Sequence, residues 1–283
     1  MSDSWQAYRK TFLSGEYAAC QFGRGLVLTY GPAFMLTPSD QMKLSTFGLS
    51  VLENYPELHT QLALRDTIAN HGGVGASSAE LACLYQYLCD KNLEQSTDLI
   101  TKRQWYLNHA WDGHGLPPSG IDFIAQQYQG LMWVDCNKNI CEHIEWPFQE
   151  YVWLVIKTND KLNTHTHLRA IPNNLDLETL DKSLNPIKDA LEQKDFSQFV
   201  DAQQQYDQAL ETFGFTTKKH KPYKDAINTL PNVAYIRGSG ALGQDTWLIL
   251  VEKSNVQKTF HAINDIFPIK THYQINLDHY DTN

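Results

Sequence analysis

The sequence has 283 residues, of which 42% are hydrophobic and 19% charged, and its formal net charge is −9. This composition is typical of a globular protein, and the negative charge argues against nucleic acid or an anionic membrane as a partner. Five cysteines without a CxxC pair disfavour a zinc ribbon or a disulfide framework. No stretch approaches the roughly 18 apolar residues of a membrane span. We therefore expect a soluble, cytoplasmic protein, and we expect it to be a monomer or a homodimer.

The first half of the chain is expected to alternate between strands and helices. Short apolar runs broken by glycines over residues 11–35 predict two or three strands with tight turns. Residues 44–52 are expected to form a strand. After a loop over residues 72–78, leucines and tyrosines recur at helical spacing and predict a helix over residues 79–89, which the polar residues 90–92 should end.

The remaining elements indicate an α+β fold. A loop rich in proline and glycine precedes a short amphipathic helix that should begin at Ile121 and stop at Gly130. The other expected elements are strands over residues 131–134, 151–157, 232–237, 246–252 and 272–277, and helices over residues 175–194, 196–213 and 256–267. Strands and helices mixed in this order are typical of α+β proteins. A domain boundary near Glu150 divides the chain into residues 1–150 and 151–283.

The loop before the first long helix, "GGVGASS", is made almost entirely of small residues. A helix N-terminus presents unpaired N–H groups and the positive end of its dipole, and glycines before it let an anion approach the backbone. The loop is therefore a candidate phosphate cradle. It is neither a Walker A loop nor a dinucleotide fingerprint. The alternative is an ordinary glycine-rich loop with a serine cap.

Two charged residues are candidate catalytic groups next to such a phosphate site. Asp122 ends the segment "PSGID" and opens a helix. It either stabilises the helix dipole or takes a proton from a substrate hydroxyl. Lys10 is either a solvated surface lysine or a cation directed at a phosphoryl group or at Asp122.

A second glycine-rich segment, "RGSGALGQD", lies between two expected strands. A hairpin turn needs one or two glycines, whereas three are spaced here at Gly238, Gly240 and Gly243. Close approach to a ligand is the functional alternative. Asp245, at the end of the segment, either orients this loop or caps it.

In their order along the chain, these segments resemble the motifs of the GHMP kinases, which include galactokinase, homoserine kinase, mevalonate kinase and phosphomevalonate kinase. The similar segments are "KTFLSGEYA" (residues 10–18), "GVGASSA" (residues 73–79), "SGID" (residues 119–122) and "SGALGQD" (residues 239–245). The resemblance spans nearly the whole chain. It implies an ATP- and Mg²⁺-dependent phosphotransferase with an N-terminal domain like ribosomal protein S5 domain 2 and a C-terminal ferredoxin-like domain, with the site between them.

The resemblance also implies a role for each matching residue. Asp122 would be the catalytic aspartate and Lys10 the lysine that accompanies it. The ATP phosphates would lie on Gly73, Val74, Gly75, Ala76, Ser77 and Ser78. The acceptor would be bound by Glu16, Tyr17, Ser119, Gly240, Ala241 and Gly243. Mg²⁺ would be held by Ser78 and, if an alignment gap is allowed, by Asp112.

Some positions depart from the family pattern. Tyr8 and Arg9 replace a Pro-Gly pair, and Glu80 replaces an alanine. Asp112 is the only carboxylate near the position at which mevalonate kinases carry a metal-binding glutamate. A relative that binds a nucleotide or metabolite without transferring phosphate therefore stays open.

The sub-family features favour phosphomevalonate as the acceptor, with mevalonate as the alternative. "GEYA" and Asp245 resemble phosphomevalonate kinase, whereas "PPSGID" preceded by His114 and Gly115 is similar to mevalonate kinase. An alcohol acceptor benefits from a base such as Asp122, while a phosphate acceptor is already an anionic nucleophile and should want several cations nearby. The candidate cations are Lys10, Arg24, Lys102, Arg103, Lys157 and Arg237.

Overall fold

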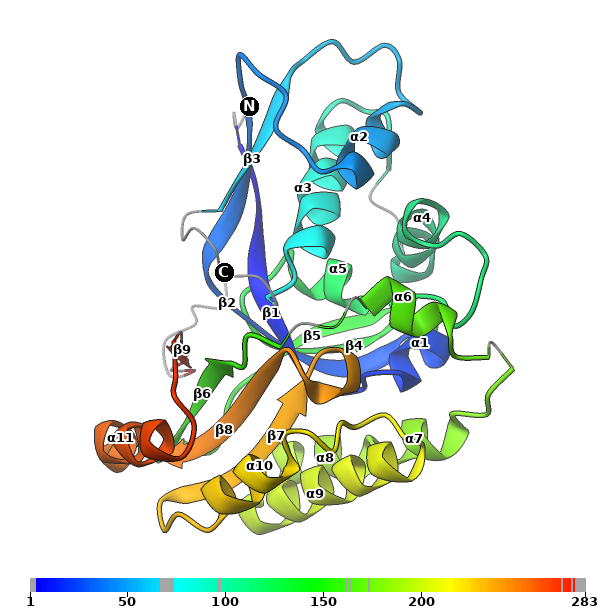
Figure 1. Cartoon of the computed structure of the whole chain (residues 1–283). Helices are drawn as coiled ribbons and strands as arrows, with labels where there is room; N and C mark the ends of the chain where they lie inside the picture. The colour runs from blue at the N-terminus through cyan, green and yellow to red at the C-terminus, as the bar shows by residue number, and fades with distance from the viewer. Residues whose placement is uncertain are drawn as a thin grey trace.

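Two antiparallel sheets, one of five strands and one of four, form the framework of the molecule (Figure 1). The computed structural model describes residues 4–66, 74–95, 98–160, 162, 164–172, 174–270, 272–275 and 277. The strands of the first sheet all precede residue 150 and those of the second all follow it. One large apolar cluster nevertheless contains residues from both halves. The division into domains 1–150 and 151–283 therefore stays a prediction.

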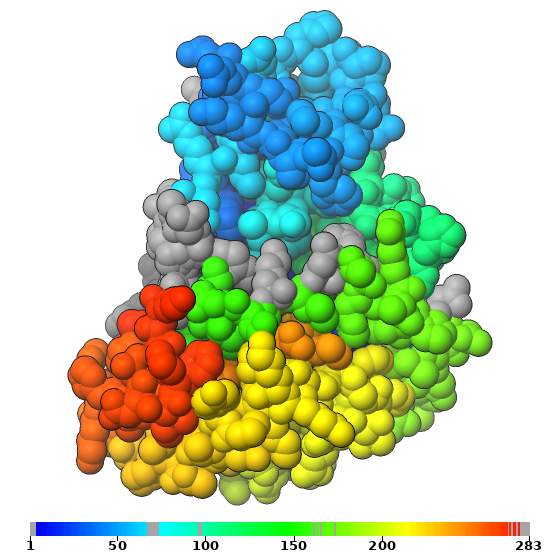
Figure 2. Space-filling model, viewed as in Figure 1, coloured from blue at the N-terminus to red at the C-terminus, as the bar shows by residue number. Residues whose placement is uncertain are grey.

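The first sheet is organised around one long strand. Its strands are β1 (Trp5–Ser14), β2 (Arg24–Pro38), β3 (Leu62–Asp66), β4 (Gly130–Asp135) and β5 (Ile140–Ile144), in the order β1-β2-β4-β5, with β3 also paired to β2. The first part of β2 pairs with β4 and its last part with β3. The far end of β2 therefore extends beyond β4, and the segment that follows it projects from the rest of the molecule (Figure 2).

Helices cover this sheet and bring two helix N-termini toward its middle. The helices of the first half are α1 (Ala18–Phe22), α2 (Thr46–Leu52), α3 (Ala76–Asp90), α4 (Leu99–Ala110) and α5 (Ile121–Ala125). α3 packs against β1 and β2 and is buried along most of its length. α5 packs between α3, α4 and the sheet.

The second sheet has the ferredoxin-like arrangement that the family resemblance implied. Its strands are β6 (Tyr151–Lys157), β7 (Val233–Ser239), β8 (Thr246–Glu252) and β9 (His272–Ile275), in the order β7-β8-β6-β9. The helices of this half are α6 (Thr164–Arg169), α7 (Glu178–Lys182), α8 (Asn185–Gln193), α9 (Phe196–Thr212), α10 (Lys221–Asn228) and α11 (Val256–Ile266). Helices between β6 and β7 and between β8 and β9 give the βαββαβ order of that fold. The α+β prediction is confirmed.

Both faces of the second sheet are buried, as β6 illustrates. Successive side chains of a strand point to opposite faces. Trp153 and Val155 enter the large cluster, which α8 and α9 also join, whereas Val152, Leu154 and Ile156 enter a second cluster with residues of α10 and α11. None of the helices in the described part of the chain has both the length and the apolar character needed to cross a bilayer.

The structure differs from the expected elements in several places. Residues 44–52 were expected as a strand but contain α2, because Ser45 caps this helix by accepting a hydrogen bond from the backbone N–H of Gly48 (3.1 Å). Glu80 of α3 in turn binds the backbone N–H and hydroxyl of Ser45. The helix that begins at Ile121 ends at Ala125, and Gly130 instead opens β4. β5, α4, α6 and α10 were not predicted, and the single helix expected over residues 175–194 is divided into α7 and α8.

Candidate active site

A cavity of about 540 Å³ lies between the two halves of the chain. β1 and the turn that follows it form one wall, and the first residues of α3 and α5 form another. α6 and the glycine-rich loop between β7 and β8 supply the remaining walls from the second half of the chain. Segments from all four sequence motifs therefore meet at one place.

Lys10 and Asp122 form an ion pair in this cavity. The Nζ atom of Lys10 lies 3.1 Å from the Oδ2 atom of Asp122, and both side chains are less than one-fifth exposed. Burial alone would raise the pKa of the Asp122 carboxyl, but the Lys10 charge and hydrogen bonds from Lys10 and Ser78 lower it below its usual value. Asp122 is therefore a carboxylate at neutral pH, and Lys10 is placed beside it and not in bulk solvent.

The small-residue loop lies against this pair. Gly75 is the N-cap of α3 with a φ of +83°, and no side chain caps the helix. A Cβ atom at Gly75 would come within 2.7 Å of the Lys10 side chain. Gly75, Ala76, Ser77 and Ser78 line the cavity, so the unpaired N–H groups of the first turn of α3 lie at its wall.

Val74 and Gly73, the other two residues of the predicted cradle, are not among the described residues that line the cavity. Val74 does not line the cavity: its side chain is buried, and its carbonyl accepts a hydrogen bond from the backbone N–H of Lys10 (3.0 Å). Gly73, like His71 and Gly72, lies outside the described residues.

Gln126 forms hydrogen bonds to several of the segments that line the cavity. Sequence reasoning did not identify it. Its side chain is fully buried, and its amide donates to the carbonyls of Tyr8 (2.7 Å) and Gly75 (3.0 Å). Its own backbone carbonyl accepts a hydrogen bond from the N–H of Tyr8 (2.8 Å). One glutamine at the end of α5 thus joins β1, the start of α3 and the helix that carries Asp122.

The turn that presents Asp122 is positioned by an arginine. Gly120 is the N-cap of α5 with a φ of +72°. Arg103 of α4 donates to the carbonyls of Ser119 (2.7 Å) and Cys20 (2.7 Å), which fixes this turn against α1. Ser119 and Asp122 both line the cavity, as the resemblance implied. Arg103, in contrast, has a structural role that sequence spacing could not reveal.

The glycine-rich loop between β7 and β8 faces the cavity on one side only. A Cβ atom at Gly238 would come within 2.2 Å of the Gly243 carbonyl, so the chain can fold back here only with glycine. Gly240, Ala241 and Asp245 line the cavity. Gly243 does not: it lines an adjoining hollow, which Glu16, Tyr17 and Gly240 also border.

Tyr17 connects three walls of the cavity through its hydroxyl. The hydroxyl accepts a hydrogen bond from the backbone N–H of Leu242 (2.8 Å) and lies 3.1 Å from the Nε2 atom of His167 in α6. The Tyr17 ring stacks on Phe215, with 3.9 Å between centroids.

Glu16 lines the cavity, and its carboxylate forms an ion pair with a buried arginine. Its Oε2 atom lies 2.9 Å from the guanidinium of the fully buried Arg237. Asp207 of α9 lies on another side of the same guanidinium, at 3.3 Å. Burial raises the pKa of the Glu16 carboxyl, although the Arg237 charge opposes that rise. Glu16 therefore anchors the turn after β1 to β7 as well as facing the cavity.

The two predicted metal ligands are not brought together. Ser78 lines the cavity beside Asp122. Asp112 forms an ion pair with Arg169 and lies in a second cavity of about 440 Å³, lined also by Phe47 and Trp111. No three His, Cys, Asp or Glu side chains within the described ranges are grouped to hold a metal. Of the two residues, only Ser78 lies in the cavity that Asp122 lines.

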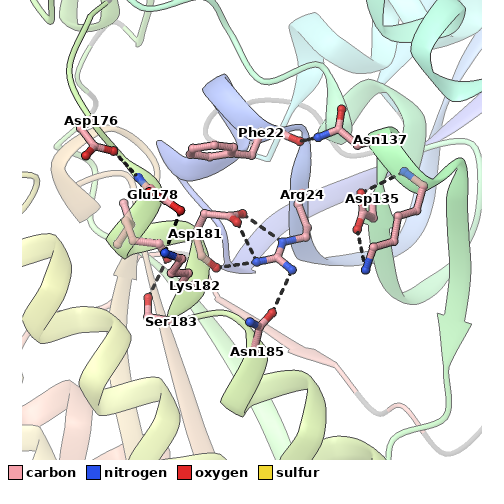
Figure 3. Close-up of polar contacts among 12 residues, drawn as sticks. Phe22, Arg24, Asp135, Asn137, Asp176, Glu178, Asp181, Lys182, Ser183 and Asn185 are labelled. Carbon is pink, nitrogen blue, oxygen red and sulfur yellow. Dashed lines mark hydrogen bonds and ion pairs between the residues drawn. The ribbon is translucent and has the colours of Figure 1, made fainter.

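Of the six candidate cations, only Lys10 lines the cavity. Arg24 of β2 makes a bidentate contact with Asp181 of α7 (2.8 and 2.9 Å) and a further bond to Asn185 (2.9 Å) (Figure 3). Arg103 and Arg237 are held by the carbonyls and carboxylates described above. Lys102 and Lys157 also lie outside the cavity lining. The six candidate cations are therefore not gathered at the described lining of this cavity.

Comparison with known proteins identifies the fold. No family model and no curated protein matches the sequence. The chain is similar to Streptococcus pneumoniae phosphomevalonate kinase in complex with phosphomevalonate and AMPPNP, with a TM-score of 0.72, 17% identity, and coverage of 96% of this chain and 99% of that one. It is also similar to Lactococcus lactis galactokinase complexed with galactose (TM-score 0.73, 13% identity, coverage 98% and 93%) and to Methanococcus jannaschii mevalonate kinase (TM-score 0.69, 13% identity, coverage 97% and 98%). The chain has the GHMP kinase fold.

Proposed function

We propose that this chain with the GHMP kinase fold is an ATP-dependent phosphotransferase that acts on a small molecule. The observation that carries the proposal is the Lys10–Asp122 pair, whose charged atoms are 3.1 Å apart in the cavity that the start of α3 also lines. Phosphoryl transfer depends on positioning and charge stabilisation more than on covalent chemistry by the protein. The Lys10–Asp122 pair and the N-terminus of α3 supply both positioning and charge stabilisation. A cytoplasmic location belongs to the same proposal.

The start of α3 suits a triphosphate. The N–H groups of Ala76, Ser77 and Ser78 are those that an anion at a helix N-terminus would contact. Ser78 would hold Mg²⁺ through its hydroxyl. Bound Mg²⁺–ATP supplies the transferable phosphoryl group, and the metal offsets its charge. The second cavity shares Ser77 with the first and offers Phe47 and Trp111 to the base of the nucleotide.

Asp122 and Lys10 have complementary tasks. Asp122 is ionised at neutral pH because its pKa is lowered, so it can accept the proton of an acceptor hydroxyl. Lys10 keeps that carboxylate in place and puts a positive charge where negative charge develops on the transferred group. An acceptor hydroxyl within hydrogen-bond reach of Asp122 completes the arrangement.

The sequence motifs favour phosphomevalonate as the acceptor and mevalonate as the alternative. Both remain within this proposal, and they make different demands on the cavity. Mevalonate offers a hydroxyl that Asp122 can deprotonate, whereas phosphomevalonate offers an ionised phosphate that needs no base. A protein that binds a nucleotide without transferring phosphate is a second candidate function, favoured by the position of Asp112 away from Ser78.

The test is a coupled assay of ADP release with Mg²⁺–ATP, in which mevalonate and phosphomevalonate are supplied in parallel with other small alcohols. Release that depends on an acceptor and is lost in Asp122→Asn supports the kinase. Intact nucleotide binding without release for any acceptor supports the binding protein instead. Binding of a non-hydrolysable ATP analogue, measured by calorimetry, separates that outcome from a misfolded preparation.

A further inference from the structure

We infer that Glu80 is a positioning residue for the nucleotide, because its carboxylate anchors the start of α2 on α3. The inference rests on the proposed kinase function, which places the nucleotide phosphates at the first turn of α3 and the base in the second cavity. Glu80 lines neither cavity. It acts by setting the distance between the wall of the base cavity that α2 supplies and the phosphate site that α3 supplies.

The Glu80 carboxylate binds the residue that caps α2. Glu80 is 3% exposed. Its Oε1 atom accepts a hydrogen bond from the backbone N–H of Ser45 (2.8 Å), and its Oε2 atom accepts one from the Ser45 hydroxyl. The oxygen of that hydroxyl accepts in turn from the backbone N–H of Gly48 (3.1 Å). A carboxylate at this place also faces the positive end of the α2 dipole. Glu80 therefore stabilises both the position and the cap of this helix.

The two ends of α2 are held in different ways. Val51, near the end of the helix, is fully buried in the large apolar cluster. At the start of the helix, Ser45 is exposed and Phe47 is half-buried. A Cβ atom at Gly48 would come within 2.8 Å of the Cδ atom of Glu80, so α2 lies directly against this carboxylate, beside α3 (Figure 1). Glu80 is thus the polar anchor for the end of α2 that carries Phe47.

The anchored end of α2 is the part of this helix that faces the second cavity. Ser45 and Phe47 line that cavity together with Trp111. Ser77 of α3 lines both the second cavity and the first. Ser77 and Glu80 are three residues apart on α3, and residues at this spacing are neighbours on the surface of a helix. One helix therefore carries both the phosphate site and the anchor of the α2 wall.

Loss of this anchor should affect the base and not the phosphates. The family pattern has alanine at position 80, and an alanine could make neither bond to Ser45. Without the carboxylate the start of α2 can shift, whereas the first turn of α3 stays in place because this helix is buried along most of its length. Preorganised spacing of two contact sites strengthens the binding of a ligand that uses both. A ligand that offers only the phosphates should not respond.

The first experiment compares a nucleotide with a phosphate chain that lacks a base. Calorimetry of the full chain with Mg²⁺ measures Kd for AMPPNP and for inorganic tripolyphosphate in the parent, Glu80→Ala and Glu80→Gln. We expect Kd for AMPPNP to rise by about fivefold or more in Glu80→Ala, as for the loss of a helix cap, with Kd for tripolyphosphate nearly unchanged. Glu80→Gln should have a smaller effect of the same kind, because one acceptor oxygen remains. Glu53→Gln changes an exposed carboxylate at the other end of α2 and should alter neither Kd.

The other outcomes of this experiment contradict the inference or the function on which it rests. Equal AMPPNP affinity in Glu80→Ala and the parent overturns the inference and leaves the kinase function standing. A parallel loss for AMPPNP and tripolyphosphate also overturns it, because Glu80 would then act on the phosphate site or on the whole fold. A parent that binds AMPPNP but not tripolyphosphate counts against it, since α3 would not hold phosphates independently of the base. A parent that does not bind AMPPNP overturns the proposed function itself.

Ser45→Ala tests the same contact from its exposed partner. This variant removes the hydroxyl that Glu80 binds and leaves the buried carboxylate in place. We expect it to weaken AMPPNP binding and to spare tripolyphosphate binding. In the Glu80→Ala background the same substitution should have a smaller effect, because residues in one hydrogen-bond network are not additive. Fully additive losses overturn the inference. If neither Glu80 variant folds, Ser45→Ala alone decides, and unchanged AMPPNP affinity then overturns the inference.

Discussion

The ammonium of Lys10 lies 3.1 Å from the carboxylate of Asp122, although one residue is on β1 and the other on α5. Nothing local brings them together. Lys10 passes over Gly75, where any side chain would collide with it, and Gln126 ties its strand to the helix of Asp122. The ion pair therefore depends on Gly75 and Gln126 as well as on its own two charges.

Replacement of Asp122 by asparagine tests its role as a base. Asparagine has the same shape but cannot accept a proton, so we expect kcat to fall by about 10²- to 10⁴-fold. Binding of AMPPNP should change little, because the proposed function puts the carboxylate beside the acceptor and not beside the nucleotide. Steady-state kinetics and calorimetry measure the two quantities, with Asp201→Asn on the exposed face of α9 as the control. Equal losses of kcat and nucleotide affinity would contradict this role.

Gly75→Ala should disturb both stability and turnover. A side chain at a positive φ costs about 1–2 kcal/mol, and here the added Cβ would also press on Lys10. Gly113→Ala is a matched control, since Gly113 has a φ of +85° but no atom within 4 Å of an added Cβ. We expect a similar loss of unfolding free energy from backbone strain in both variants, and a loss of kcat in Gly75→Ala alone. Equal kcat values in the two variants would argue against the packing of Lys10 on Gly75.

Ser78→Ala tests the proposed metal ligand. Loss of the hydroxyl should raise the Mg²⁺ concentration needed for half-maximal rate, by about tenfold. Ser77→Ala removes a neighbouring hydroxyl from the same turn and should leave the metal requirement nearly unchanged. A magnesium titration at fixed ATP gives the comparison. An unaltered requirement in Ser78→Ala would remove this residue from the metal site.

Arg237 should be important for stability because it neutralises buried acids. Arg237→Met leaves Glu16 and Asp207 without their buried partner, and loss of one partner of a buried pair costs about 3–5 kcal/mol of unfolding free energy. Adding Glu16→Gln to this variant should recover part of that loss, because one uncompensated charge disappears. Urea denaturation of the two variants and the parent measures the difference. If the double variant is no more stable than Arg237→Met, the two residues are not coupled as the structure indicates.

His167 should make stability depend on pH. Burial lowers its pKa from the ordinary value of 6.5, so the native state resists a proton that the unfolded chain accepts. Because the unfolded state binds more protons, the free energy of unfolding should fall as the pH drops below about 6.5. In His167→Gln this fall should be smaller between about pH 7.5 and 5.5, while His143, His220 and His272, whose pKa values are also lowered, still contribute. Identical pH profiles of unfolding free energy in His167→Gln and the parent would contradict the lowered pKa of His167.

Residues 44–52 show where sequence reasoning fails in this chain. Their apolar content predicted a strand, but the helix that forms is held by Glu80, a residue of α3 that is close in space and distant in sequence. The position of Asp112 also could not be predicted from the sequence. Its place in the motif order suggested a metal ligand, whereas the path of the chain puts it beside Arg169.

The sequence by itself indicated the α+β fold type and four of the segments that line the cavity, because these depend on local properties: glycines that permit a positive φ, small residues at a helix N-terminus, and apolar residues repeating every two or every three to four positions. It did not indicate α6, which also lines the cavity. Only the tertiary structure decided which charges meet. Arg24, Arg103 and Arg237 are bound away from the cavity while Lys10 faces it, because ion pairs between segments remote in sequence depend on how the chain folds around them.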